Sequence, residues 1–326
     1  MAIKKSSELD FSNKKISFLI CARPGVGKTT LAESAPKPLI VDLENGIDRV
    51  EACYRGDVST IEGDVAEEDK YELFVHDLLN EDLSDYETII IDSLGKLVDL
   101  LKPVVIKESA ANALKDGKTL SMKGYGAVSQ KVSDFIQMVK GLGKHVGFIS
   151  HVTEKDDGEV IKTRLNIAGS TKDKIWDDID LGGYMTYLGK DRVIYFTPSE
   201  QWDAKGTHGI TGMYKIPTLK STKEGGKFSD NHFLSDLFRV FLEDLNSTKE
   251  QYNSDLQIYN NAMLIKDKLL SVNSVEQLNL IVEEIKNTAH ALTSREELLS
   301  FVQNKAKELN AIYDKTTKHY ITKEQE

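Results

Sequence analysis

Residues 22 to 29 carry the pattern with the clearest chemical meaning. The segment reads Ala22-Arg23-Pro24-Gly25-Val26-Gly27-Lys28-Thr29 and matches G-x-x-x-x-G-K-[ST], with alanine at the first glycine position. In such a turn, backbone N–H groups point at phosphate oxygens, the lysine reaches the β- and γ-phosphates and the threonine hydroxyl faces Mg²⁺. The pattern predicts a site for ATP and Mg²⁺ whose nucleotide-binding residues are Arg23, Pro24, Gly25, Val26, Gly27, Lys28, Thr29 and Thr30.

Asp92 is the predicted acidic partner of this turn. It ends the apolar run Thr88 to Ile91, and an aspartate that ends a buried strand can fix the Mg²⁺ shell, usually through water, beside a threonine hydroxyl. A helix N-cap would also explain Asp92 taken alone. The combination with the turn favours Thr29 and Asp92 as the metal-side residues.

Glu44 is the best-placed candidate for activating water. Hydrolysis needs a carboxylate or amide that orients water opposite the leaving phosphate. Glu44 lies just past the apolar run Pro38 to Asp42, between the two motifs. Asp42 is a weaker candidate, and a solvated loop charge is the alternative for Glu44. We predict catalytic roles for Lys28 and Glu44.

The order of these motifs resembles RecA-type ATPases. Asp42-Leu43-Glu44 resembles their strand ending in aspartate, one residue, then the catalytic glutamate, and Ile91-Asp92-Ser93 resembles their Walker B motif. Within this class, residues 12 to about 245 look most like phage nucleotide-binding proteins of the Sak type, which are single-strand annealing and recombination ATPases. The resemblance implies an α/β, RecA-like P-loop NTPase core with a mainly parallel sheet.

The resemblance also implies two further catalytic residues. His151 follows the run Val146 to Ser150, where RecA-type ATPases carry a polar sensor of the γ-phosphate. Lys205 follows the run Val193 to Ser199, where they carry a pair of basic residues that reach the neighbouring subunit's phosphate; Thr207 stands at the second position. An ordinary hydrogen-bonded histidine and a solvated loop lysine are the alternatives.

Two basic segments are the candidate DNA-binding loops. Residues 107–144 hold seven lysines against three acidic residues, a net charge of +4, and residues 160–174 hold four basic residues against Asp173, a net charge of +3. Such charge runs are usually solvated faces, but RecA-like recombinases hold single strands through two loops of this kind. The predicted DNA-binding residues are Lys118, Lys123, Tyr125, Lys162, Arg164, Lys172 and Lys174.

Short apolar runs that alternate with helical segments indicate βαβ units and a largely parallel sheet. The predicted strands are Ile16–Cys21, Pro38–Asp42, Thr88–Asp92 and Val146–Ser150. Beyond His151 we expect antiparallel pieces at residues 158–168 and 184–198, and a short closing helix at residues 231–245.

A joint near residue 247 divides the chain into a RecA-like P-loop ATPase domain, residues 1–246, and a small C-terminal α-helical module, residues 247–326. The module has no glycine or proline. Its amphipathic pattern predicts three helices, with Leu278 and Val282 on one face and Leu298, Val302 and Tyr313 on another. Ser274 with Gln277, and Ser294 with Glu297, predict two capping boxes.

The composition favours a globular protein without a membrane span. The chain has 326 residues, 40% hydrophobic residues, a formal net charge of −10 and two cysteines, Cys21 and Cys53. No apolar run approaches a membrane span, the N-terminus lacks the apolar segment of a signal peptide, and two cysteines give no disulfide framework. We expect a cytoplasmic protein, in the host cell if the chain is phage-encoded.

These observations predict a Mg²⁺- and ATP-dependent ATPase that self-associates into an oligomer or filament. It would act on single-stranded DNA in phage recombination or replication, by annealing or strand exchange. Two alternatives stay open. One is a helicase or helicase loader on the same core. The other is a nucleotide-dependent binding module without hydrolysis, whose C-terminal helices recruit replication or recombination proteins.

Overall fold

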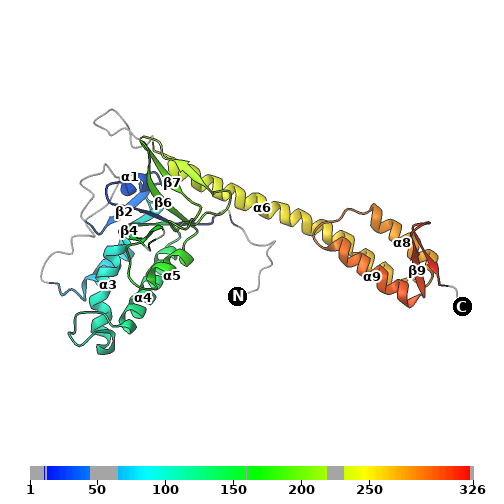
Figure 1. Ribbon diagram of the computed structural model, residues 1–326, viewed down its shortest axis with the longest axis horizontal. Coiled ribbons are helices and arrows are strands. Elements are labelled where there is room, and N and C mark those ends of the chain that lie inside the picture. The colour runs from blue at the N-terminus through cyan, green and yellow to red at the C-terminus, as the bar shows by residue number, and fades with distance from the viewer. Residues whose placement is uncertain are drawn as a thin grey trace. The chain divides into compact units, whose positions relative to one another are not determined.

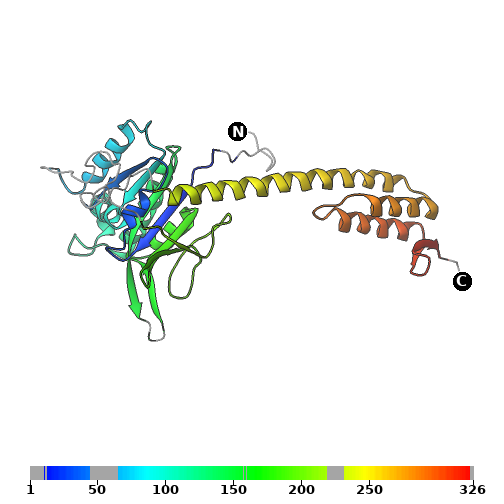
Figure 2. The same cartoon turned by 90° about the horizontal axis from the view of Figure 1, so that it is seen from above.

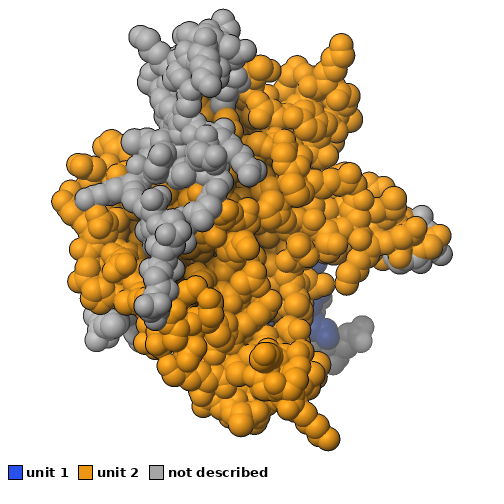
Figure 3. All heavy atoms as spheres, turned by 90° about the vertical axis from the view of Figure 1, so that its left-hand side faces the viewer, with its two compact units in different colours: residues 1–11, 245–326 blue, residues 12–244 orange. Residues whose placement is uncertain are grey.

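The computed structural model describes residues 11, 13–44, 65–156, 158, 160–218 and 231–323; Cys53 lies outside them. Contacts divide the chain into a larger unit, Ser12–Asp244, drawn in orange in Figure 3, and a smaller unit, Met1–Phe11 with Leu245–Glu326. The larger unit contains, in chain order, β1 (Ser17–Ala22), α1 (Lys28–Ala32), β2 (Pro38–Asp42), α2 (Lys70–Asn80), β3 (Thr88–Asp92), α3 (Leu94–Glu108), η3 (Ala110–Asn112), α4 (Met122–Lys140), β4 (His145–Asp156), β5 (Ile161–Leu165), α5 (Thr171–Asp178), β6 (Leu181–Leu188), β7 (Asp191–Tyr195) and β8 (Met213–Lys215).

Five neighbouring strands of the main sheet run parallel, in the order β2-β3-β4-β1-β6, and β7 and β8 continue the sheet antiparallel. The predicted α/β fold with a mainly parallel sheet is therefore confirmed. The register pairs Ala22 with His151 and Asp42 with Asp92. Because parallel strands end at one edge, the predicted catalytic residues near these positions are gathered at that edge.

The parallel strands are buried on both faces, as their continuous apolar runs require. One face packs against α2, α3, α4 and α5, and the last three of these helices are successive neighbours (Figure 1). On the other face, the Phe18 ring of β1 meets the Phe238 ring at 5.2 Å between centroids. No helix in the described part of the chain is both long and apolar enough to cross a membrane.

The predicted strands at Pro38–Asp42 and Thr88–Asp92 match β2 and β3 residue for residue, and β1 is shifted by one residue. β4 is longer than predicted and ends at Asp156, because its second half pairs antiparallel with β5. In Figure 2 this green hairpin projects from the body of the larger unit. The second predicted antiparallel piece contains the β6–β7 hairpin, but β6 also pairs parallel with β1.

The predicted short helix at residues 231–245 is wrong in its length. α6 runs without interruption through Phe233–Met263, across the predicted joint. The reason is local: no glycine or proline stands between these residues to end the helix.

The smaller unit continues with α7 (Ile265–Ser271), α8 (Val275–Asn287), α9 (Ser294–Glu308), β9 (Ala311–Asp314) and β10 (His319–Thr322). A C-terminal helical region is confirmed, but the prediction of helices alone is wrong, because β9 and β10 form an antiparallel hairpin. Tyr313 lies on β9 and not on a helix face. Ser274 caps α8 as predicted, whereas Ser294 is the first residue of α9 and Thr293 is its N-cap residue.

Candidate nucleotide-binding site

The glycine-rich turn joins β1 to α1. Gly25 and Gly27 have φ angles of 77° and 93°, a conformation that L side chains rarely adopt. The two glycines therefore let the backbone curve tightly between the fully buried strand and Lys28, the first residue of α1. The eight predicted nucleotide-binding residues, Arg23 to Thr30, form this turn and the start of the helix.

Thr29 and Asp92 are brought into contact. The Thr29 hydroxyl donates to Asp92 Oδ2 at 2.6 Å. Burial raises the pKa of Asp92 to about 6, and the bond from Thr29 opposes part of that rise. A hydroxyl and a carboxylate are the hard oxygen donors that Mg²⁺ prefers, with phosphates and waters filling its remaining positions. The two residues therefore fit a Mg²⁺–nucleotide complex.

Glu44, Ser93, His151 and Lys28 form one chain of contacts. Lys28 Nζ lies 3.2 Å from His151 Nδ1, and His151 Nε2 lies 3.2 Å from Glu44 Oε2. Ser93 Oγ donates to Glu44 Oε1. A protonated Lys28 must donate to Nδ1, so a neutral His151 carries its proton on Nε2 and donates it to Glu44.

The surroundings shift the pKa values of Glu44 and Lys28. The bond to His151, with that from Ser93, lowers the pKa of Glu44 to about 2. Burial lowers the pKa of Lys28, although Asp92 and Glu44 oppose this effect. Glu44 is thus held as a carboxylate, in the form that can accept a proton.

A cavity of about 400 Å³ opens beside Glu44, Ser93 and His151. Lys96 and Lys102 of α3 also line it; neither was among the predicted site residues. Their position in the sequence could have predicted them, because α3 begins two residues after Asp92 and its first turns must lie near the same sheet edge.

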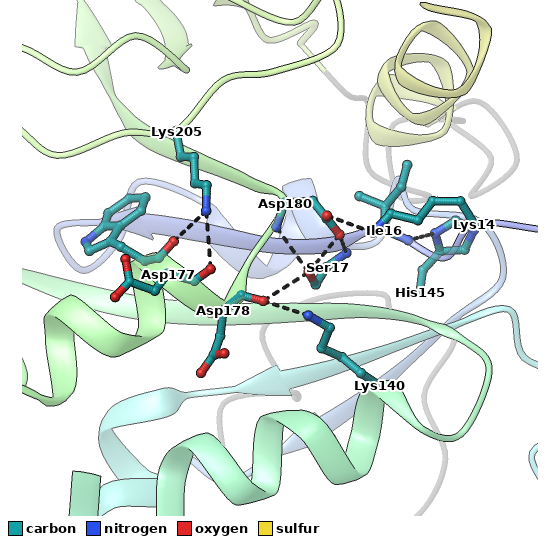
Figure 4. A network of polar contacts seen from close by, with 10 residues as sticks. Lys14, Ile16, Ser17, Lys140, His145, Asp177, Asp178, Asp180 and Lys205 are labelled. Carbon is teal, nitrogen blue, oxygen red and sulfur yellow. Dashed lines mark hydrogen bonds and ion pairs between the residues drawn. The ribbon is translucent and has the colours of Figure 1, made fainter. Parts of the chain in front are cut away.

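Lys205 does not join this group. Its backbone bridges to Gly182 of β6, which pairs with Leu19 near the middle of β1. Its ammonium donates to the carbonyls of Trp176 and Asp177 at the end of α5, at 2.8 and 3.4 Å (Figure 4). These contacts hold the loop before residue 205 to α5. The predicted action of Lys205 on the phosphate of a neighbouring subunit stays a prediction.

The predicted DNA-binding residues lie on several elements. Lys118 precedes α4, Lys123 and Tyr125 lie in its first turn, Lys162 and Arg164 lie on β5, and Lys172 and Lys174 lie on α5. The two basic segments lie close together. Lys174 donates to Gln130 of α4, and a Cβ placed on Gly169 would lie 3.9 Å from Tyr125 Cβ.

The Arg164 guanidinium is held by several partners within the chain. It donates to the carbonyls of Thr163, Glu200 and Gln201 and pairs with Asp203 at 3.5 Å. These bonds fix β5 to the loop after β7. They give Arg164 a structural role whether or not it also meets DNA.

The model of a family described as "AAA domain" matches residues 14–208. A KaiC-like protein from the hyperthermophilic archaeon Pyrococcus horikoshii OT3 is 10% identical over 62% of this chain and 90% of its own, with a TM-score of 0.32. A second solved structure, of an isolated ATPase domain, is 16% identical over 65% of this chain and 84% of its own, with a TM-score of 0.29. No curated protein matches.

Proposed function

We propose, because the chain belongs to the AAA domain family, that it is a Mg²⁺-dependent P-loop ATPase that hydrolyses ATP and acts on single-stranded DNA. The observation that carries the ATPase proposal is the contact chain Lys28–His151–Glu44–Ser93 beside the Thr29–Asp92 pair. It combines a phosphate-binding lysine, an oxygen pair suited to a metal and a carboxylate held ionised.

In this proposal the side chains act at defined atoms. Lys28 Nζ binds the β- and γ-phosphates, and Thr29 with Asp92 holds Mg²⁺, which supplies charge neutralisation on the phosphates. Glu44 accepts a proton from water as the water oxygen attacks the γ-phosphorus and the bond to the ADP oxygen breaks. Ser93 and His151 orient the two Glu44 oxygens for that step.

His151 is suited to sense the γ-phosphate. Lys28 Nζ already lies within hydrogen-bond distance of both Arg23 O and His151 Nδ1, and a phosphate bound at Lys28 would bring its negative charge close to the imidazole. The imidazole is also bonded to Glu44 and lines the cavity shared with Lys96 and Lys102. A change at Lys28 would therefore reach the water-activating group and the cavity wall together.

The DNA part of the proposal rests on the charge of the two basic segments and on the hydrogen bond from Lys174 to Gln130, which joins them. Lysines that contact phosphates neutralise the backbone without reading bases, and a tyrosine can stack on a base. Recombination or replication of DNA, in an oligomer or filament, is the setting that the RecA-type resemblance suggests.

The test is ATP hydrolysis with and without single-stranded DNA, on wild type, Lys28→Ala and Glu44→Gln. We expect DNA to stimulate the wild type. Lys28→Ala should lose both nucleotide binding and hydrolysis, whereas Glu44→Gln should keep ATP binding and lose hydrolysis by roughly 100-fold or more.

An unchanged rate in Glu44→Gln would overturn the assigned base. Tight ATP binding without hydrolysis in the wild type would favour the non-hydrolysing binding module. Hydrolysis that DNA does not stimulate would reject the DNA proposal. Separation of DNA strands driven by ATP would favour the helicase alternative.

A further inference from the structure

Arg192 brings a guanidinium to the glycine-rich turn from a distant part of the sequence. It is the second residue of β7, and a Cβ placed on Gly27 would lie only 2.6 Å from Arg192 Nη1. The side chain therefore rests on the backbone of the residue that precedes Lys28. Glycine at position 27 is what permits this approach.

The backbone of Arg192 is firmly placed. Arg192 pairs with Tyr187 of β6 across the hairpin, and its carbonyl accepts from Ile216 N at 2.9 Å. The two following residues, Val193 and Ile194, are buried. The guanidinium thus reaches the turn from a strand that extends the same sheet as β1.

The charge of Arg192 is not balanced within the described part of the chain. The acidic neighbour Asp191 pairs with Lys215 at 2.8 Å, and Arg23 of the turn pairs with Glu154. Among the described residues, no hydrogen bond or ion pair engages the Arg192 guanidinium. A guanidinium stays protonated and offers five N–H donors in a planar fork that matches phosphate oxygens.

We propose that Arg192 binds the phosphate chain of the nucleotide in its own subunit, as a second cation beside Lys28. This inference rests on the proposed ATPase function and extends it. It differs from the role predicted for Lys205, because Arg192 touches the turn of its own chain. Two alternatives are that Arg192 stacks on the base of the nucleotide, or that its guanidinium faces solvent and does not contact the nucleotide. The experiment below separates them.

The experiment measures binding of ATP with Mg²⁺, and of inorganic triphosphate, by competition against a fluorescent ATP analogue. It compares wild type, Arg192→Ala and Arg192→Lys, with Lys190→Ala as control. Lys190 is an exposed cation two residues away in the same hairpin. Denaturation midpoints without nucleotide show whether each variant keeps its fold.

We expect Arg192→Ala to weaken both ligands by a similar factor, roughly 10- to 100-fold, because each loses the same charge-assisted hydrogen bonds. Arg192→Lys should recover part of the loss, since it restores the charge without the fork. Lys190→Ala should bind both ligands like the wild type. If Arg192→Ala does not fold, the affinities of Arg192→Lys for ATP and for triphosphate are compared with those of the wild type. A similar weakening for both ligands supports the proposal, and unchanged affinities contradict it.

Weaker ATP binding with unchanged triphosphate binding would overturn the proposal in favour of base stacking. Wild-type affinity in Arg192→Ala, together with lost binding in Lys28→Ala, would overturn it and leave the ATPase proposal intact. No nucleotide binding by the wild type would reject both. Hydrolysis restored by mixing Lys28→Ala and Arg192→Ala subunits would show that Arg192 acts on a neighbouring subunit instead.

Discussion

At the scale of single residues, the Thr29 hydroxyl has two roles that one substitution can separate from packing. It donates to Asp92, and in the proposed function it also faces the metal. Thr29→Val keeps the shape of the side chain and removes the oxygen. We expect about 10-fold weaker Mg²⁺-dependent ATP binding, the scale of one lost hydrogen bond to a charged group, with binding in excess chelator unchanged.

The matched control is Thr29→Ser, which keeps the hydroxyl and should stay near the wild type. Calorimetric titration of ATP at several Mg²⁺ concentrations and in excess chelator gives the affinity with and without the metal. Equal Mg²⁺ dependence in Thr29→Val and wild type would remove Thr29 from the metal site.

The predictable part of the site consists of residues at or after the carboxyl ends of apolar runs, although β4 itself continues past His151 to Asp156. Lys28, Glu44, Asp92 and His151 follow apolar runs, and parallel strands of matched length bring such positions to one edge. The sequence around Arg192 does not predict a role at the site, since an isolated arginine in a strand is equally typical of a solvent-exposed sheet edge. Its contact with Gly27 depends on a hairpin that returns to the sheet 165 residues later along the chain.

At the scale of elements, two glycines of α4 test how closely this helix packs. A Cβ on Gly124 would lie 2.1 Å from the backbone oxygen of Asn112, whereas a Cβ on Gly126 would meet nothing within 4 Å. We expect Gly124→Ala to lower the free energy of unfolding by about 1 to 3 kcal/mol through overpacking. Gly126→Ala should raise it by about 0.5 to 1 kcal/mol through helix propensity.

Urea unfolding followed by circular dichroism measures the free energy of unfolding of both variants. Since the substitutions are chemically identical and two residues apart, opposite signs would report packing against η3. Similar effects of the two would contradict the close approach.

The start of β4 predicts a pH dependence of stability. His145 Nδ1 accepts from Ile16 N at 3.0 Å (Figure 4), and its ring stacks on Phe238. Burial, followed by the nearby Lys15, lowers the pKa of His145 from 6.5 to about 4. The unfolded chain therefore binds the proton more readily. The contribution of His145 to stability is complete above pH 6.5 and is lost as the pH falls toward 4.

The difference in the free energy of unfolding between pH 7 and pH 5 should be on the order of 2 kcal/mol smaller in His145→Gln than in the wild type. Glutamine can still accept from Ile16 N but does not titrate. Denaturant unfolding at the two pH values measures this. Identical pH dependence in the two proteins would show that His145 titrates normally in the fold.

Elements were predictable where the sequence marks both ends. Pro38–Asp42 and Thr88–Asp92 each follow a charged residue and end at an aspartate, and their strands have those bounds. α6 has no such mark at residue 245, so the polar run Asn246-Ser247-Thr248 lies inside a helix. The β9–β10 hairpin was missed because Ile312 and Tyr313 continue a helical spacing from α9, while their pairing partners lie in β10.

At the scale of the whole molecule, each of the two units has a hydrophobic core of its own among the residues that the structure describes. One lies between the main sheet and α2 to α5, and the other is formed by residues between Ala262 and Ala306. The second core contains none of the residues assigned to the nucleotide. We therefore expect that each unit can be destabilised without the other.

Leu298 tests this independence. It is fully buried in the smaller core, whereas the adjacent Leu299 is 40% exposed. Leu298→Ala removes buried methyl groups and should cost about 2 to 5 kcal/mol in that unit. Hydrogen exchange should accelerate in α7, α8 and α9, while exchange in β1, β3 and β4 and the affinity for ATP stay at wild-type values. Leu299→Ala, the same substitution one residue along, should change neither. If Leu298→Ala instead accelerated exchange in the main sheet or weakened ATP binding, the two units would have to unfold as one cooperative structure, and the smaller unit would contribute to the stability of the nucleotide site.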